Sequence, residues 1–208
     1  MIYQPIVITG PTSEPVTTDE VRQHLRIDQL GDGAENTAQE TEIERFITAA
    51  RVYFEKTTAR TLHEQTLEWV TDRWFGDYIA LPRATPLIAI SSLKWKDTAG
   101  TETTIGASDY IADTDSTPGR LVRAYGISWP STTLYPSNPI RIRYRAGVAT
   151  ASPVTDIGDE FKLPIMMLVA GMWEQRESEV VTDMKTLESI ALRWGIEKMM
   201  AELTVHAS

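Results

Sequence analysis

The feature that most constrains the fold is an amphipathic helical pattern over residues 41–60. Its apolar residues recur three and four positions apart, which is the spacing of one buried face of an α-helix. Such a face needs a partner surface, and the best partner in the chain is the apolar segment Phe161–Trp173. We therefore expect two sequence-distant helical segments to close around each other. The apolar positions of the first helix are Ile43, Phe46, Ile47, Ala50 and Phe54.

Between these helices, residues 62–150 change to strand patterning. Apolar and polar residues alternate most clearly in TLEWVT and in IRIRYR, and turn-forming residues separate the short stretches. Six such strands predict a small antiparallel sheet or sandwich. They are expected near residues 67–71, 78–81, 87–96, 110–112, 120–124 and 140–145.

The ends of the helices can also be predicted. Thr17 with Glu20 three residues later matches the capping box and predicts the start of a first helix, whereas the polar, glycine-containing segment 28–37 is predicted to be a loop. Pro164 is expected in the first turn of its helix, where a missing N–H costs little. A last helix is predicted over 184–203, although Gly195 in its middle costs about 1 kcal/mol relative to alanine.

These elements predict an α+β fold. Residues 1–61 would supply an N-terminal arm and helices to a helical bundle, and residues 151–208 would complete this bundle. Residues 62–150 would form the inserted β-rich domain.

Composition excludes several classes of protein. The absence of cysteine removes disulfides and thiolate chemistry, and it fits a reducing compartment. The N-terminal residues show no signal-peptide pattern, and the longest apolar run, Ile165–Trp173, is much shorter than the ~20 residues that span a bilayer. We expect a soluble protein without membrane contact. Its net charge of −9 disfavours tight DNA binding.

The sequence contains no recognisable catalytic, cofactor-binding or metal-binding pattern. The three histidines lie in different predicted elements without metal-ligand spacing, and the glycine motifs that hold phosphates are missing. The D-x-D at Asp113 and Asp115 is more typical of a turn. We therefore expect neither an enzyme nor a cofactor. A carboxylate-based hydrolase is the less favoured alternative, since it would need at least two carboxylates converging in a cleft.

Arg141, Arg143 and Arg145 alternate with apolar residues and must share one strand face. Three interpretations are open. The arginines could form an anion- or DNA-facing stripe, they could pair with acids of a neighbouring strand, or they could bridge to an acidic neighbouring subunit, because arginine suits interface ion pairs. We favour pairing within the sheet.

The order of these signals resembles the head–tail connector (adaptor) proteins of tailed bacteriophages and gene transfer agents. The resemblance departs in the 31–37 loop and after residue 180. The matching segments are VTTDEVRQHLRI (16–27), AARVY followed by FEKTTARTLHEQT (49–66), LPR with PL (81–83 and 86–87), YRAG (144–147), and LP with WEQRE (163–164 and 173–177).

The resemblance implies a structural virion protein of the neck, assembled in the bacterial cytoplasm. About twelve copies would form a ring below the portal protein, join it to the stopper or tail, and let DNA pass through the lumen without specific binding. The alternative is a stopper or tail-completion protein of the same neck. Candidate subunit-interface residues are Glu44, Arg51, Glu55, Arg141, Arg143 and Arg145. By position, candidate portal-docking residues are Leu187, Ile190, Trp194, Met199 and Leu203.

Overall fold

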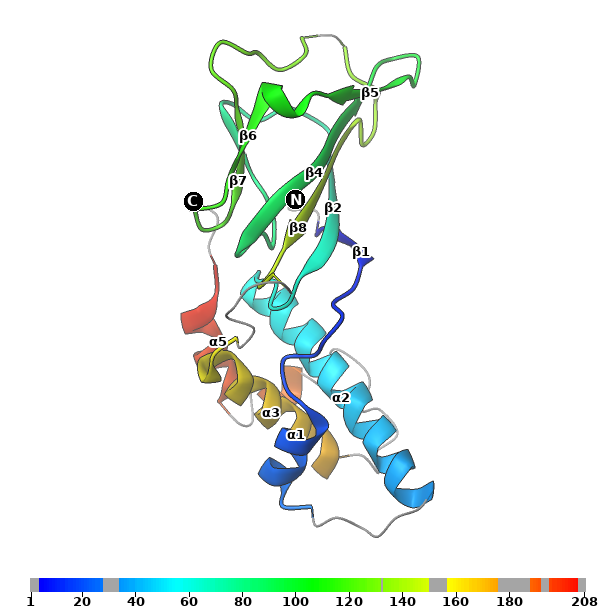
Figure 1. The fold of residues 1–208 in the computed structure, drawn as a ribbon, viewed down its shortest axis with the longest axis vertical. Coiled ribbons are helices and arrows are strands. Elements are labelled where there is room, and N and C mark those ends of the chain that lie inside the picture. Colours follow the sequence, from blue (N-terminus) through cyan, green and yellow to red (C-terminus); the bar gives the residue numbers. More distant parts are fainter. Residues whose placement is uncertain are drawn as a thin grey trace. The chain divides into compact units, whose positions relative to one another are not determined.

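The computed structural model describes residues 4–27, 34–131, 133–149, 157–175, 188–191 and 195–205. The chain divides into two compact units. The helical unit comprises residues 13–58 and 156–204, and the strand unit comprises residues 1–12, 59–155 and 205–208. Helices and antiparallel strands occur in separate parts of the chain, so the predicted α+β class is confirmed (Figure 1).

The helical unit begins with α1 (Thr18–Leu25), which starts at the predicted capping box. The Thr17 side chain accepts a hydrogen bond from the Glu20 backbone N–H, and the Glu20 carboxylate accepts one from the Thr17 backbone. Lys162 binds Glu20 at 3.1 Å and thereby links α3 to α1. These contacts lower the pKa of Glu20, chiefly through the Thr17 backbone hydrogen bond.

The long helix α2 (Ala34–Thr58) packs against α3 (Asp159–Glu174) as the apolar stripes predicted (Figure 1). The rings of Phe54 and Phe161 meet edge to face, with centroids 6.3 Å apart. The predicted loop over 28–37 is wrong at its end, because α2 already starts at Ala34. The first residues of this helix are mostly polar. They show no apolar periodicity from which the start of the helix could be predicted.

Two further helix predictions need correction. Pro164 lies in the second turn of α3 and not in the first, since the helix starts five residues earlier, at Asp159. One continuous C-terminal helix is also wrong, because Gly195 has a left-handed backbone (φ +69°) and precedes α5 (Ile196–Leu203). Glycine adopts this conformation at little steric cost, so it separates α5 from the helical residues 188–191.

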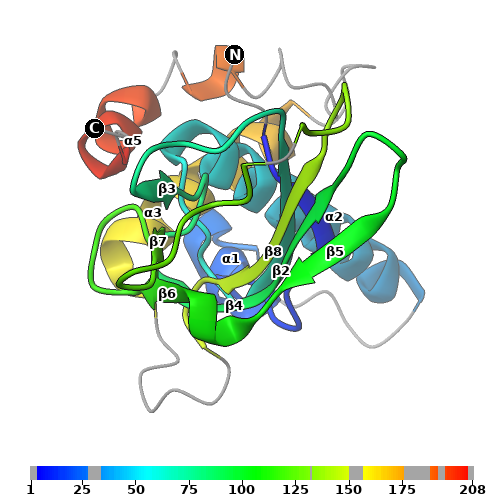
Figure 2. The ribbon, with the colours of Figure 1, turned by 90° about the horizontal axis from the view of Figure 1, so that it is seen from above.

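The strand unit contains a five-stranded antiparallel sheet in the order β1-β2-β8-β4-β5 (Figures 1 and 2). The six strands predicted in 62–150 are all present, and β5 was missed. Residues 6–9 of the N-terminal arm form the edge strand β1, which pairs with β2. The members are β1 (Ile6–Thr9), β2 (Gln65–Thr71), β8 (Ile140–Ala146), β4 (Leu87–Lys96) and β5 (Glu102–Ile105).

A second, three-stranded sheet has the order β3-β7-β6. Its inner residues join one face of the larger sheet in a common apolar core, which includes Ile79 and Leu121. Tyr144 of β8 is fully buried in this core, and its hydroxyl donates to the Pro82 carbonyl. The second sheet consists of β3 (Tyr78–Ala80), β7 (Arg120–Arg123) and β6 (Tyr110–Asp113), with the short helix η1 (Ala107–Asp109) before β6.

Candidate functional site

The outer face of the five-stranded sheet carries an excess of cations. In β8, Ile140, Ile142 and Tyr144 are fully buried, so the alternating arginines point to the opposite, solvent side. The side chains of Arg141, Arg143 and Arg145 are 38, 44 and 46% exposed. One face of β8 is therefore buried and apolar, and the other is charged and partly exposed, as the sequence predicted.

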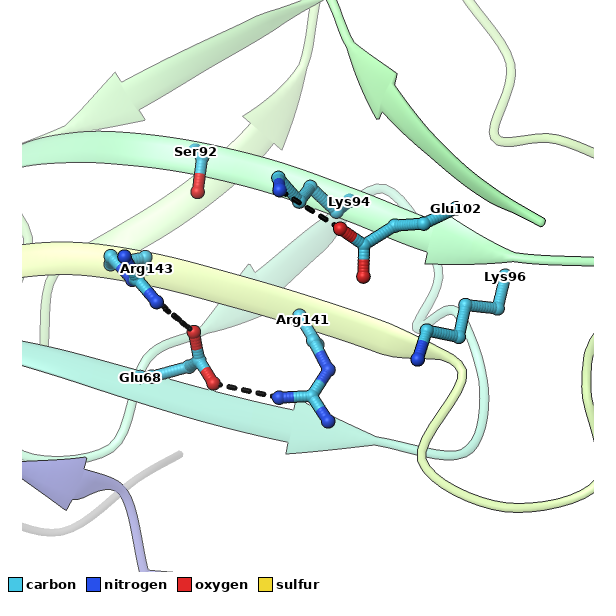
Figure 3. Close-up of a pocket in the computed structure, with 7 residues that line it drawn as sticks. All are labelled: Glu68, Ser92, Lys94, Lys96, Glu102, Arg141 and Arg143. Carbon is cyan, nitrogen blue, oxygen red and sulfur yellow. Dashed lines mark hydrogen bonds and ion pairs between the residues drawn. The ribbon is translucent and has the colours of Figure 1, made fainter. Parts of the chain in front are cut away.

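The neighbouring strand β4 adds two lysines to this face. Lys94 lies opposite Arg141 in the β4–β8 register, and Ser92 lies opposite Arg143. Together with acids from β2 and β5, these residues line a hollow of about 270 Å³ (Figure 3). We call it the cationic hollow; it is lined by Glu68, Ser92, Lys94, Lys96, Glu102, Arg141 and Arg143.

Glu68 connects two of the arginines. One carboxylate oxygen lies 2.8 Å from Arg141 Nη1, and the other lies 2.8 Å from Arg143 Nη2 (Figure 3). Arg145 contacts Glu64 at 3.3 Å in the same way. Pairing of the arginines with acids of the adjacent strand is thus present, and in the pairs with Glu68 the carboxylate is buried while the arginines stay half-exposed.

Cations outnumber carboxylates in the lining of the cationic hollow. Lys94 binds Glu102 at 2.9 Å, and the pKa of Glu102 is lowered, first by this hydrogen bond and then by the charges of Lys94, Lys96 and Arg141. Four cations and two carboxylates line the hollow, which leaves a formal excess of two positive charges. Such a site attracts anionic groups and provides donors for them.

The acidic residues are the remaining candidates for chemistry in the part of the chain that the structure describes. No group of three or more His, Asp or Glu side chains there could hold a metal ion. Asp113 serves a turn, because its carboxylate accepts hydrogen bonds from Ser116 and Arg120. These contacts, led by the Ser116 hydroxyl, lower its pKa to about 2. Over the same residues, no helix is long and apolar enough to cross a membrane.

The structure separates the three helical residues that we proposed for the subunit interface. Glu44 is exposed on α2, whereas Arg51 and Glu55 are buried. Arg51 donates to Glu14 at 2.7 Å and to Glu55 at 3.2 Å. The expectation that Arg51 and Glu55 lie on an exposed charged face is therefore wrong. Both side chains are buried, and their charges are paired inside the helical unit.

The candidate portal-docking residues also differ in their surroundings. Leu187 and Trp194 lie outside the described residues. Ile190 is fully buried, and its Cγ2 lies so close to Gly171 that a Cβ added there would come within 2.3 Å of it. Met199 and Leu203 are partly exposed on α5. Of the described candidates, only the two α5 residues present surface to a partner.

Sequence reasoning identified the arginines of this site but missed its other charged residues. Lys94 and Lys96 alternate with Leu93 and Trp95 in β4, so the same period-two signal could have placed them on one face. Glu68 and Glu102 could not be assigned, because the acid that meets each cation depends on strand order and register.

Comparison with solved structures finds chains of the same fold in gene transfer agent particles. A chain in the virion of a native gene transfer agent particle matches with TM-score 0.67 and 21% identity. Chains in the neck of an empty particle, with C6 symmetry, and in the neck of a native particle, with C12 symmetry, match with TM-scores 0.66 and 0.68 at 23% and 19% identity. Each match covers 99% of this chain and 97% of the other. No family model and no curated protein match the sequence.

Proposed function

We propose that the protein is a structural subunit of the neck of a tailed phage-like particle. The observation that carries this proposal is the full-length similarity of fold to chains in such necks, one of them solved with C12 symmetry. The cation-rich sheet face supports it, because such a face can bind an acidic surface of a neighbouring protein. The function would need no cofactor.

Within the neck, we propose the role of head–tail connector. About twelve copies would form a ring that binds the portal protein on one side and the stopper or tail on the other, with DNA passing through the lumen. The neutral-to-cationic strand unit and the acidic helical unit offer different surfaces for these contacts. Glu44 and the arginines of β8 remain candidates for the subunit interface, and Met199 and Leu203 for portal docking.

The proposed ring can be tested by native mass spectrometry of the protein, alone and mixed with the portal protein of the same particle. We expect a ring of about twelve copies, either free or bound to the portal. A monomer in the absence of the portal is compatible with the proposal, because the portal can template assembly. Absence of any ring or portal complex across a range of salt concentrations would contradict it.

The alternative is a stopper or tail-completion protein of the same neck, which would bind the tail side. Exposed positions on α5 discriminate between the two roles. Substitution of Met199 and Leu203 by aspartate should weaken portal binding if the protein is the connector. The matched control is Lys198→Asp on the same helix, where the side chain is exposed. Unchanged portal binding by the M199D/L203D variant would favour the stopper role.

A further inference from the structure

The two units carry very different charges. The segments of the helical unit contain 20 acids and 10 bases, whereas those of the strand unit contain 9 acids and 10 bases. Their net charges are therefore −10 and +1, which together give the −9 of the chain. The cationic hollow lies in the strand unit. The helical unit of a second copy of the chain is an acidic surface that is present at the same concentration as the hollow.

The first part of α2 is an acidic stretch of that unit. Residues 34–44 contain four glutamates and no basic residue. The Glu40 side chain is 41% exposed and contacts Arg22 at 3.2 Å, and Glu44 is exposed one turn further along the helix. Residues four apart lie on the same face of a helix. Glu40 and Glu44 therefore form a short acidic row on one face of α2, in which Glu40 is half-exposed and paired with Arg22 and Glu44 is exposed.

The spacing of this row matches the spacing of the cations. Side chains at i and i+4 on a helix lie about 6 Å apart. Side chains at i and i+2 on a strand lie roughly 6.5–7 Å apart, because a strand rises about 3.3 Å per residue. Lys94 and Lys96 on β4, and Arg141 and Arg143 on β8, have the strand spacing. One helix laid along the sheet could thus bring both glutamates opposite cations.

We propose that the cationic hollow binds the acidic row Glu40 and Glu44 of a second copy of this chain. The inference rests on the proposed ring and names its subunit contact. A ring is a head-to-tail assembly, in which each copy must offer two different, complementary surfaces. Duplex DNA is the competing occupant. The acidic chain repels it at long range, and Glu68 and Glu102 already offset part of the positive charge in the hollow.

The test compares ring assembly of wild type with that of charge variants by native mass spectrometry, under the conditions in which wild type assembles. Lys96→Glu should weaken assembly at least about tenfold, since it places like charges together at the contact. It breaks none of the ion pairs described above, so the fold should persist in circular dichroism. Glu44→Lys should cause a similar loss. The control K56E/K198E replaces two exposed lysines of the helical unit and should assemble as wild type.

Combining the two changes gives the decisive measurement. A chain with both Lys96→Glu and Glu44→Lys has exchanged charges on its two surfaces and should recover assembly. Wild-type assembly should also weaken between about 0.05 M and 0.5 M salt, as screening shortens the reach of charges. If the single variants assemble as wild type, or the combined variant stays as weak as either, the inference is overturned while the proposed neck function stands.

A separate measurement addresses DNA. Fluorescence anisotropy with a ~30-bp duplex at about 0.1 M salt should detect no binding to wild type. Micromolar binding that K94E/K96E abolishes would assign the hollow to the phosphate backbone and overturn the inference. If wild type forms no ring, alone or with the portal protein, the proposed function itself fails, and this result is distinct from both outcomes above.

Discussion

Arg51 is a buried cation of the helical unit that pairs with two carboxylates. Its guanidinium binds Glu14 and Glu55, and the side chains of Arg51 and Glu55 are only 8 and 1% exposed. Burial by itself would lower the pKa of Arg51, but the hydrogen bond to Glu14 and the charge of Glu55 raise it overall. The arginine thus fixes the segment before α1 onto α2.

Replacing Arg51 by methionine should therefore destabilise the protein strongly. The substitution keeps apolar bulk but leaves the buried Glu55 carboxylate without its guanidinium, and breaking a buried pair from one side costs about 3–5 kcal/mol. Urea unfolding followed by helical circular dichroism measures this loss. Arg45→Met, at an exposed site of the same helix, is the control and should change stability by less than about 0.5 kcal/mol. A loss below about 1 kcal/mol for Arg51→Met would contradict this account.

Asp113 gives a prediction for the pH dependence of stability. Its pKa falls from 3.8 to about 2 in the folded protein, so its stabilising contribution is complete above about pH 5 and is lost progressively as the pH falls toward 2. The difference in thermal midpoint between wild type and Asp113→Asn should stay constant from about pH 7 to 5 and then shrink. Asp115→Asn, an exposed neighbour, should show little difference throughout. A difference that persists at pH 2 would refute the role of the carboxylate charge.

At the scale of elements, the contact between α3 and the helical residues 188–191 depends on a missing side chain. Gly171 lies inside α3, where alanine is normally better by about 1 kcal/mol. A Cβ at this position would, however, come within 2.3 Å of Ile190 Cγ2. Ile190 is itself fully buried and has little room to move. The steric conflict should outweigh the helix propensity.

We therefore expect Gly171→Ala to lower the free energy of unfolding by about 1–3 kcal/mol, the usual cost of overpacking. Adding Ile190→Ala removes the methyl group that clashes. The two changes should therefore be non-additive, with the double variant no less stable than Ile190→Ala alone. Denaturant unfolding of the four proteins gives this coupling. Gly76→Ala, where a Cβ meets nothing within 4 Å, is the control. Additive losses would show that the cost of a Cβ at position 171 does not come from a clash with Ile190.

The same scale shows which elements sequence reasoning could predict. Where one face is buried, the pattern was decisive: IRIRYR defined both β8 and its charged side, and the stripe ending at Phe54 identified the partner of α3. Where an element is exposed on most sides, the pattern of apolar residues did not predict it. β5 reads ETTI, with its first three residues exposed, and the start of α2 has no apolar period. Gly195 was recognised as costly, but its left-handed conformation depends on surroundings that periodicity does not encode.

For the whole molecule, the sequence predicted that helical segments from both ends of the chain would pack together, because an apolar helix face needs a partner surface. It could not predict which acid meets which arginine, since Glu68 lies more than seventy residues from Arg141 and Arg143 and meets them only through strand order. It also could not separate exposed from buried charge on α2, because Arg51 and Glu55 look like surface residues until Glu14 is placed beside them. The charged faces of a chain therefore follow from its sequence only after the register and the packing are known.

The return of the C-terminal segment to the helical unit leads to a last prediction. Deleting residues 184–208 would remove Ile190, Ile196 and Met200, which are all fully buried. Each such loss typically costs about 2–5 kcal/mol, and together they approach or exceed the roughly 5–15 kcal/mol that holds a domain folded. Hydrogen exchange should show that α2 and α3 lose their protection in the truncated chain. The strands β2, β4 and β8 should keep theirs, because their core draws on residues 67–146.

The matched variant is M199D/L203D, which changes partly exposed residues of the same segment and should keep protection in both units. If the truncated chain retained protected α2 and α3, the buried residues of the C-terminal segment would not be needed for the helical core, and a direct docking role for the whole segment would regain support. If protection is lost as expected, missing portal binding in such a truncation reports unfolding of the helical unit. Docking residues can then be identified only by substitutions on the exposed side of α5.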